Sequence, residues 1–224
     1  MRLQLYLTAS QAVPFDHLAA LKGAFHRWLG HNEELHDGLS LYSLSWLRGG
    51  RAGRGGLWYR EGAYWSISAH DPQLIHTLVG GVIREPDLGL GLTVRDARLT
   101  QPPQFQDGEQ WFRVLSPVFV KYLAPEAKLG DTADHLLYDN PRADELLTAT
   151  LQRKLRQAGL SDAGVSVRFD RAYAGAKTKL FRYKQVQCRA SQCPVIVTGT
   201  AEQIRFAWCV GVGHSTGLGC GALE

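Results

Sequence analysis

The 224-residue sequence predicts an α+β fold made of two successive units of similar design. Stretches with period-two alternation and stretches with an apolar helical face follow one another as strand, helix, strand, strand, helix, strand. The same order returns in the second half, and a Pro- and Gln-rich stretch without periodicity separates the halves. We therefore expect two tandem ferredoxin-like (RRM-like, βαββαβ) domains, each a sheet covered by two helices.

The first unit covers residues 1–100. Its expected elements are a strand at 2–8, a helix from Pro14 to Gly30, strands at 39–47 and 57–68, a helix that begins at Asp71-Pro72, and a strand at 92–99. Asp71 is a typical N-cap and Gly30 a typical helix end, so both helices have defined boundaries. Between the two central strands, a Gly- and Arg-rich stretch predicts a flexible basic loop at 48–56.

The linker is expected at 101–110 and the second unit at 111–224. Its expected elements are a strand at 112–121 interrupted by Pro117, a helix at 141–157 between Asn140 and Gly159, a hairpin at 165–173 and 179–188, a strand at 195–197 that continues this sheet, a helix at 201–210, and a closing strand.

Composition narrows the class of protein. The chain has no run of about 18 apolar residues, and its start lacks the apolar core of a signal peptide, so we expect a cytoplasmic protein without a membrane segment. The four cysteines, Cys188, Cys193, Cys209 and Cys220, form no C-x-x-C pair and have no neighbouring histidine pair. Reduced thiols are expected, with no metal and no cofactor.

Basic residues gather in the second half of the chain. Residues 1–110 hold 10 Lys and Arg against 11 Asp and Glu, whereas residues 111–224 hold 15 against 10. Arginine outnumbers lysine 18 to 7, which suits bidentate phosphate contacts. Solvated strand faces are one interpretation and an anionic, nucleic-acid partner is the other. The candidate phosphate contacts are Arg48, Arg51, Arg54, Arg168, Arg171, Lys177, Lys179, Arg182 and Lys184. Nearby Tyr173, Phe181 and Tyr183 could stack on bases or form sheet core.

The glycine-rich segment at 211–221 is the most specific feature of the sequence. Its glycines permit positive φ and can expose backbone N–H groups to a phosphate backbone. The candidate binding residues here are Gly211, Gly213, His214, Ser215, Thr216, Gly217 and Gly219. A dinucleotide-binding loop is excluded because a helix precedes the glycines and only three residues follow them, and a P-loop is excluded because no lysine follows.

Two other interpretations of this segment stay open. One is a tight structural turn without a ligand. The other treats His214 to Thr216 as half of a two-histidine phosphoesterase site, which needs a second His-x-Thr or His-x-Ser that the sequence lacks.

These features resemble a known family. A penultimate helix followed by G-x-G-x-x-x-G-x-G near the C-terminus resembles the signature of RAMP proteins, and the similarity is greatest to the CRISPR repeat-RNA endoribonucleases. Other matching stretches are Arg2 to Leu5, Leu35-His36 followed by Tyr42 to Leu44, Leu115 to Val118, and Val197 to Gly199. The resemblance covers nearly the whole chain and implies two ferredoxin-like domains.

RNA cleavage without a metal needs few protein groups. The substrate carries its own nucleophile, the 2′-hydroxyl, so the protein must remove that proton, protonate the 5′-oxygen and stabilise the charged intermediate. Histidine titrates near neutral pH and suits these roles. His26, His31 and His36 lie within eleven residues of one another. Each taken singly could be a surface or structural histidine.

The resemblance implies a role for each of these residues. The family's catalytic histidine follows a leucine in this loop, which makes His36 the first candidate for general acid or base, and its second catalytic group late in the first helix corresponds to His26. A lysine that completes several family sites is absent from Asp37 to Ser40. Arg27, His31 or an arginine of 48–54 could replace it, and Tyr42 and Ser43 are weaker candidates.

The resemblance thus implies a metal-independent endoribonuclease that cleaves CRISPR precursor RNA within its repeats. The first alternative is a non-catalytic repeat-RNA-binding subunit of a CRISPR ribonucleoprotein complex, and a less favoured one is an enzyme acting on a small phosphorylated ligand. CRISPR repeat RNA is the expected partner. A CRISPR effector complex and a homodimer stay open.

Overall fold

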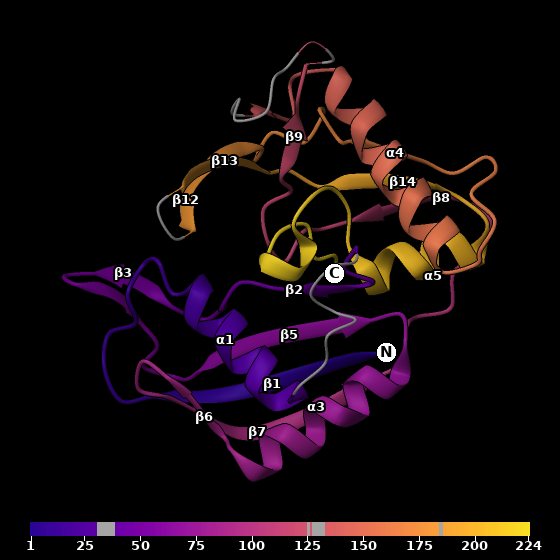
Figure 1. Cartoon of the computed structure of the whole chain (residues 1–224). Helices are drawn as coiled ribbons and strands as arrows, with labels where there is room; N and C mark the ends of the chain where they lie inside the picture. The colour runs from indigo at the N-terminus through magenta and orange to yellow at the C-terminus, as the bar shows by residue number, and fades with distance from the viewer. Residues whose placement is uncertain (31–38, 125, 127–132, 184–185) are drawn as a thin grey trace.

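The computed structural model describes residues 1–30, 39–124, 126, 133–183 and 186–224. Figure 1 shows two α+β halves stacked on each other, with the C-terminal end of the chain lying between them beside strand β2 (Tyr42–Leu44). The α+β class expected from the sequence is therefore observed.

The first half forms a five-stranded antiparallel sheet in the order β2-β5-β1-β7-β6. Its remaining strands are β1 (Arg2–Ala9), β5 (Ala63–Ala69), β6 (Asp87–Gly89) and β7 (Leu92–Thr100). Helices α1 (Leu18–Leu29) and α3 (Pro72–Arg84) pack with alternate residues of β1 and β5, such as Leu5 and Trp65, in one core. Period-two alternation produces this arrangement because every second strand residue points to the helices.

The second half contains a three-stranded antiparallel sheet in the order β11-β14-β8. Its elements are β8 (Gly108–Phe112), α4 (Arg142–Gln157), β11 (Ser166–Phe169), β14 (Val195–Gly199) and α5 (Ala201–Val210). The chain end continues this sheet beyond β8, because Val114 forms an antiparallel bridge with Leu223. A short 3₁₀ helix, η1 (Thr216–Leu218), lies in the glycine-rich segment.

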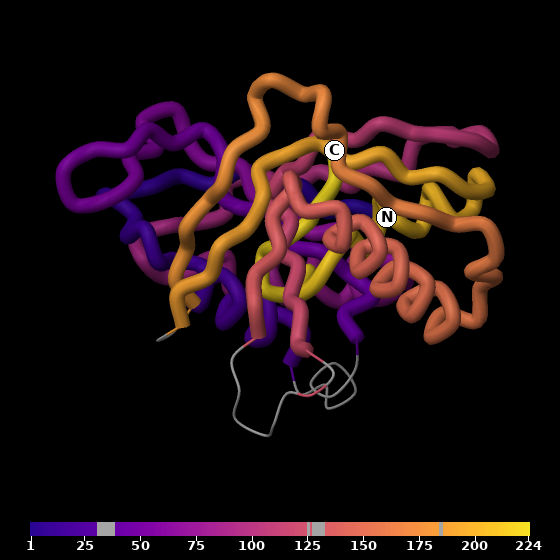
Figure 2. The backbone as a smooth tube through the Cα atoms, turned by 90° about the horizontal axis from the view of Figure 1, so that it is seen from above, coloured from indigo at the N-terminus to yellow at the C-terminus, as the bar shows by residue number. Residues whose placement is uncertain are grey.

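Two further hairpins extend from the second half. They are β9 (Val120–Tyr122) with β10 (Asp134–Leu136), and β12 (Lys177–Tyr183) with β13 (Val186–Gln192). Figure 2 shows both reaching toward the same edge of the molecule.

Several expected elements differ from the structure. The strand expected at 112–121 is not continuous, because β8 ends at Phe112 and β9 begins at Val120. The expected 165–188 hairpin is wrong, because β11 pairs with β14 and β12 pairs with β13. Val167 of β11 is buried in the core of the second half, whereas Phe181 of β12 contacts Trp46 of the first half, so the two strands serve different cores. Strand β8 begins at Gly108, inside the expected linker.

The basic stretch at 48–56 is also more regular than expected. It contains most of a hairpin formed by β3 (Arg51–Gly53) and β4 (Gly56–Trp58), with Gly55 at φ 85° in the connection. A positive φ at this position favours glycine, which is why the Arg- and Gly-rich sequence can fold as a hairpin.

Helix α1 begins at Leu18, four residues after the expected start at Pro14, whereas the other helix boundaries follow the sequence closely. The Asp71 carboxylate accepts a hydrogen bond from the Gln73 N–H at 2.8 Å, and Thr200 caps α5 in a reciprocal capping box. All four cysteines are buried free thiols. Among the described helices none combines the length and apolarity of a membrane span.

The crossing of α1 and α3 supplies a stability prediction. A methyl group on Gly81 would overlap the Trp28 backbone, whereas one on Gly80 would meet only the flexible end of Arg84. We expect Gly81→Ala to lower the free energy of unfolding by about 1–3 kcal/mol through overpacking. Gly80→Ala, the matched control, should raise it by up to about 1 kcal/mol through helix propensity. Urea denaturation of the two variants measures both; equal effects would contradict the close helix contact.

Candidate functional site

The site is built on the contact between β2 and the second half of the chain. Strand β2 lies at the edge of its sheet, and its free carbonyls need donors. The hydroxyl of Thr216 donates to the Tyr42 carbonyl at 2.9 Å, and the hydroxyl of Ser116 donates to the Leu44 carbonyl at 3.3 Å. In return, the Ser43 hydroxyl donates to the Cys209 carbonyl at 3.2 Å. The edge is therefore completed by side chains from the other half.

The glycine-rich segment makes this close approach possible. A Cβ on Gly217 would clash with the side chains of Ser40 and Tyr42, and one on Gly211 would lie 2.6 Å from the Gly221 carbonyl oxygen. Gly211, Gly213 and Gly219 have φ of 69°, 77° and 93°, a conformation that favours glycine.

The expected phosphate-binding role of these glycines needs correction. Gly211, Gly213, Gly217 and Gly219 are all buried, and Thr216 is sealed between β2 and α4. Their small size serves packing between the halves, so they do not form an open cradle. Only His214, Ser215 and Leu218 of this segment stay partly exposed. Ser215 is a non-glycine residue at φ 60°, at the surface of the turn.

Three positively charged residues, Lys121, Arg153 and Lys154, act electrostatically on the partly exposed His214. Burial, followed by the positive charges of these three residues, lowers the pKa of His214 to about 4. The ring is therefore neutral at pH 7, and its Nδ1 accepts a hydrogen bond from the Lys121 N–H at 3.2 Å. Lys121 and Arg153 are exposed, so the surface beside the glycine turn is electropositive. An anion is the natural ligand for such a surface.

Lys154 donates hydrogen bonds to the end of α5 and to the glycine-rich segment. Its ammonium group is buried in the middle of the molecule, where it donates to the Val210 carbonyl at 3.1 Å and to the Thr216 hydroxyl at 2.9 Å. Burial lowers the Lys154 pKa to about 7, and the neighbouring charge of Arg153 contributes. Val210 is the last residue of α5, where a cation interacts favourably with the helix dipole.

Of the three expected catalytic histidines, only His26 is among the described residues. His31 and His36 lie outside the described residues. The residues that border them are described: Gly30 ends α1, and Ser40 lies against Gly217. His26, in the last turn of α1, is half-buried with its ring 5.4 Å from that of Phe25. Ser40 is thus held close to the glycine turn, whereas it is Leu18, at the start of α1, that lies beside Gly219.

Three further catalytic candidates are buried or bound to other residues of the chain: Tyr42, Ser43 and Arg27. Tyr42 is 3% exposed and Ser43 fully buried, so neither hydroxyl can reach an RNA, and both leave the list of candidates. Burial raises the pKa of the Tyr42 phenol. Arg27 is bound to the Glu85 carboxylate at 3.1 Å and to the Asp87 carbonyl at 3.1 Å. These contacts tie its guanidinium to the side of α1 that faces β6.

A groove of about 960 Å³ runs between the halves near the start of α1. Arg48, Lys179 and Arg182 contribute positive charge to its lining, and Asp16 is the acidic lining residue. Phe15 projects at its rim with 62% of its surface exposed. Arg48 also pairs with the Glu224 carboxylate at 2.9 Å, an exposed contact that contributes little to stability.

The remaining basic candidates divide into two groups. Arg51, Arg54 and Lys177 are exposed on the β3–β4 and β12–β13 hairpins, and Lys184 lies outside the described residues. Arg168 and Arg171 instead have carboxylate partners, Glu109 at 3.4 Å and Asp144 at 2.6 Å.

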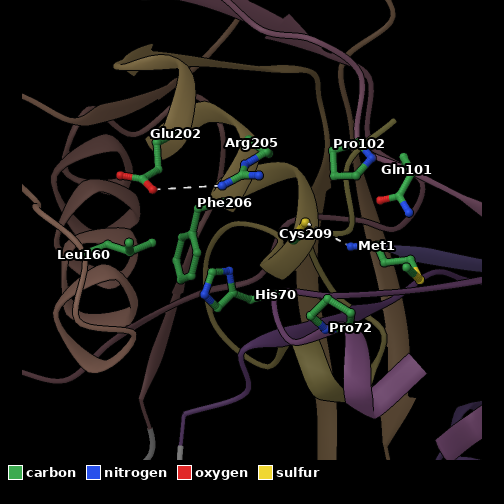
Figure 3. A pocket seen from close by; sticks show the side chains of 10 residues that line it. All are labelled: Met1, His70, Pro72, Gln101, Pro102, Leu160, Glu202, Arg205, Phe206 and Cys209. Atoms are coloured by element: carbon green, nitrogen blue, oxygen red, sulfur yellow. Dashed lines mark hydrogen bonds and ion pairs between the residues drawn. The ribbon is translucent and has the colours of Figure 1, made fainter. Parts of the chain in front are cut away.

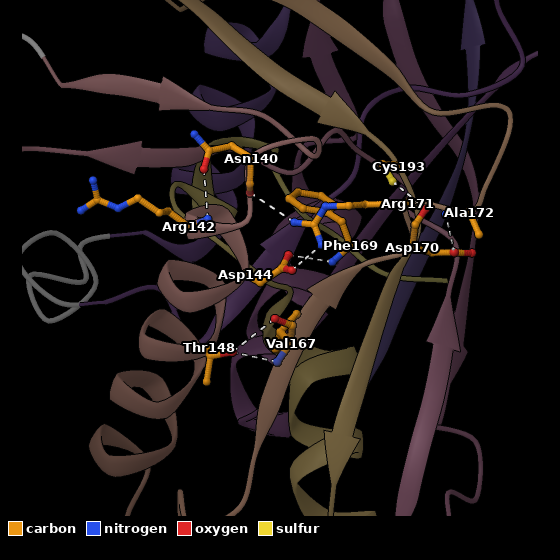
Figure 4. Close-up of polar contacts among 10 residues, drawn as sticks. All are labelled: Asn140, Arg142, Asp144, Thr148, Val167, Phe169, Asp170, Arg171, Ala172 and Cys193. Atoms are coloured by element: carbon orange, nitrogen blue, oxygen red, sulfur yellow. Dashed lines mark hydrogen bonds and ion pairs between the residues drawn. The ribbon is translucent and has the colours of Figure 1, made fainter.

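Figure 4 shows how Arg171 and its neighbours join β11 to α4. The Asp144 carboxylate also accepts the Phe169 N–H at 3.0 Å, and the Thr148 hydroxyl accepts the Val167 N–H at 2.9 Å. These bonds satisfy the edge of β11, so Arg171 acts in the fold and we do not include it in the interface.

A smaller pocket of about 110 Å³ lies elsewhere between the halves (Figure 3). His70, Glu202 and Arg205 line it together with Phe206, whose ring is 4.9 Å from that of His70. None of the residues singled out from the sequence as site candidates lines this pocket. Within the described segments, no group of three or more His, Cys, Asp or Glu side chains is placed to hold a metal ion.

Sequence reasoning did not single out Lys121, Arg153 or Lys154. Lys154 carried a signal, because it falls on the apolar stripe of its helix with Leu147 and Leu151. A lysine on such a stripe is unusual and indicates a buried polar contact. Lys121 and Arg153 carried none, since only the fold brings them beside His214.

Solved structures with the same fold are found by comparison. The fold matches a CRISPR-associated protein Cas6 with a TM-score of 0.82 and 21% identity, over 100% of this chain and 98% of that chain. A Cas6-related protein from Pyrococcus furiosus matches with 0.83 and 20%, over 100% and 97%. A RAMP protein described as binding different RNA substrates matches with 0.84 and 18%, over 100% and 98%. The chain thus shares the fold of these three solved structures.

The family follows from the sequence match. Residues 100–224, more than half of the chain, match the family model of the C-terminal part of CRISPR-associated protein Cas6. The protein therefore belongs to the Cas6 family, CRISPR-associated RAMP proteins that process precursor CRISPR RNA. No match was found among curated protein sequences.

The buried lysine gives a pH-dependent prediction. The Lys154 pKa is about 7 in the folded chain against 10.5 ordinarily, so between these values the unfolded chain binds more protons. Its contribution to the free energy of unfolding should therefore rise with pH by up to about 1.4 kcal/mol per pH unit. His214, with a pKa of about 4, stays neutral in this range.

Urea denaturation of wild type and Lys154→Met at several pH values from about 7 to 9.5 isolates this contribution. The stability of wild type relative to the variant should increase as pH rises. A difference that does not change with pH would show that Lys154 does not titrate in this range.

Proposed function

We propose that this protein is a metal-independent endoribonuclease that cleaves CRISPR precursor RNA within its repeats. The 2′-hydroxyl of the substrate attacks the adjacent phosphorus, and the 5′-oxygen of the next nucleotide leaves. The products are a 2′,3′-cyclic phosphate and a 5′-hydroxyl. Membership of a family that processes precursor CRISPR RNA supports the substrate class.

The observation that carries the proposal is the position of the cationic turn. The Lys121 backbone N–H donates to His214 at the glycine turn, and the charges of Lys121 and Arg153 both lower the pKa of His214. The same turn packs against Ser40. A phosphate held at this surface would lie near Ser40, which follows closely in sequence the segment that contains His36. His36 is proposed as general acid or base, with His26 or His31 as the second proton-transfer group. Lys121 or Arg153 would stabilise the charged intermediate in place of the missing family lysine.

The groove near the start of α1 is proposed to hold RNA that flanks the cleavage site. Its lining by Arg48, Lys179 and Arg182 supports contacts to phosphates. The β3–β4 hairpin with Arg51 and Arg54 would extend this surface, and Lys177 would extend it on the β12–β13 hairpin. Solved relatives described as Cas6 product complexes support RNA as the partner, at 14% and 22% identity.

We also propose that both halves are ferredoxin-like domains. In the first half, β1 and β5 are central and β2 and β7 flank them, as a βαββαβ unit requires. In the second half, β14 lies between β11 and β8. The isolated bridge of Val114 with Leu223 supports the chain end as the fourth strand, on the other side of β8. The two additional hairpins of the second half would then be insertions in this unit.

Replacement of His36 tests catalysis. Wild type incubated with CRISPR repeat RNA in EDTA should give one specific cut, and His36→Ala should lower the rate by about 10²- to 10⁴-fold with the Kd for RNA unchanged, because a proton-transfer group is lost. His76→Ala, an exposed histidine on α3, is the control and should cleave normally. A 2′-deoxynucleotide at the scissile position should also block cleavage of the RNA.

Each contrary result has a specific meaning. Tight, specific binding without any cleavage by wild type would establish the non-catalytic subunit instead. Full activity of His36→Ala would remove this histidine from the mechanism.

Replacement of the cations beside His214 tests the RNA surface. Lys121→Ala and Arg153→Ala should each weaken RNA binding, and each should reduce the slope of log Kd against log salt by about 1, because one phosphate contact is lost. Arg98→Ala, an exposed arginine on β7, is the matched control. Filter binding at several salt concentrations measures the slopes. Equal slopes for all three variants would place the RNA elsewhere.

A further inference from the structure

Two histidines lie on the same face of the chain as Lys121, one on each side of β9. His214 forms an antiparallel bridge with Phe119, and His135 of β10 is the cross-strand partner of Lys121. Paired residues, and residues two positions apart on one strand, point to the same face of a sheet. The Phe119 ring agrees with this arrangement, because its centre lies 5.4 Å from the Lys121 ammonium and 4.9 Å from the His135 ring.

Each histidine ring is held by a hydrogen bond from a backbone N–H. The Nδ1 atom of His214 accepts the Lys121 N–H at 3.2 Å, and the Nδ1 atom of His135 accepts the Arg189 N–H of β13 at 3.3 Å. A ring nitrogen that accepts a hydrogen bond carries no proton, so the proton of each neutral ring is on Nε2. Among the described residues, no hydrogen bond involves either Nε2. Both rings are partly exposed, so both Nε2–H groups can donate to a ligand.

The same hydrogen bonds favour the uncharged form of both rings. Protonation of Nδ1 would set its proton against the N–H that now donates to it. Burial, followed by the charges of Lys121 and Arg189, lowers the pKa of His135, against the opposite effect of Asp134. The pKa of His214 is about 4, although a contact with the Phe119 carbonyl raises it. Each ring is therefore a neutral hydrogen-bond donor at neutral pH.

An acceptor-only ligand matches these two donors. The non-bridging oxygens of a phosphodiester accept hydrogen bonds and have no proton to donate, and most contacts of proteins to nucleic acids are made to such oxygens. Lys121 and Arg189 are both exposed and add positive charge beside the rings. Figure 2 shows the β9–β10 and β12–β13 hairpins, which carry His135 and Arg189, reaching toward the same edge of the molecule.

We propose that His135 and His214 bind RNA as neutral rings, each donating from Nε2–H to a phosphate oxygen of the RNA backbone on its own side of Lys121. They extend the RNA surface from the glycine turn across β9 to Arg189 on β13. This inference rests on the proposed function in RNA processing. Neither ring acts as a general base, because its Nε2 already carries a proton. A neutral donor displaces no counterion from the RNA, so its contribution to affinity does not depend on salt.

The experiment separates a neutral donor from a cation and from a structural residue. Filter binding of CRISPR repeat RNA gives the Kd and the slope of log Kd against log salt for wild type, His135→Asn, His135→Gln and His214→Asn. The Asn amide oxygen replaces Nδ1 as acceptor without a donor at Nε2, whereas the longer Gln places an amide N–H near the Nε2 position. His135→Asn and His214→Asn should each raise the Kd about ten-fold with the slope unchanged. His135→Gln should bind almost like wild type.

Two controls calibrate the measurement. His76→Ala, at an exposed histidine on α3, should change neither the Kd nor the slope. Lys121→Ala should lower the slope by about 1, because a cation is lost. If His214→Asn does not fold, the two His135 variants decide.

Each contrary result has one meaning. A slope lowered by about 1 in His135→Asn or His214→Asn would show a charged ring and overturn the neutral donors. Wild-type affinity in both Asn variants, or a loss in His135→Gln but not in His135→Asn, would overturn the RNA contact. Specific cleavage by wild type would leave the endoribonuclease standing in each of these cases. A wild type that binds no repeat RNA would overturn both proposals.

Discussion

The rest of the structure depends on how the free edge of β2 is satisfied. An edge strand between two domains presents carbonyls that water cannot reach, and each would cost free energy if left without a donor. Here the hydroxyls of Thr216 and Ser116 supply those donors from the other half. The two halves are therefore joined by directional bonds as well as by apolar packing. The relative position of β2 and the glycine turn follows from these bonds.

The glycine-rich segment acts mainly through what it allows to come close. Side chains at Gly211 and Gly217 would push the turn away from Ser43, Ser40 and Tyr42 and would break the hydroxyl contacts with β2. In the proposed RNA interface, its contribution is therefore indirect. The buried glycines form a closely packed turn. The exposed side chains of Lys121 and Arg153 lie beside this turn and are proposed to bind a phosphate.

The sequence predicted the order of helices and strands better than it predicted strand partners. Asp71 and Gly30 marked helix boundaries because capping is local chemistry. The partner of β11 depended on which core Val167 and Phe181 enter, and alternation along the chain is the same in either case.

The sequence predicted some features of the candidate site and missed others. The glycine segment was recognisable, but its burial was not, since glycine suits an open phosphate loop and a tight packing turn equally well. Lys121 and Arg153 were missed because residues about thirty positions apart gave no sign of meeting at His214. His36 was selected by family resemblance and lies outside the described residues, so its role is a proposal.

The most direct measurement is a crystal structure of the protein bound to repeat RNA with a 2′-deoxynucleotide at the cleavage position. The scissile phosphate should lie between the His36 side chain and the surface formed by Lys121, Arg153 and Ser215. A phosphate bound on another face, or a His36 side chain turned away from it, would contradict the proposed arrangement.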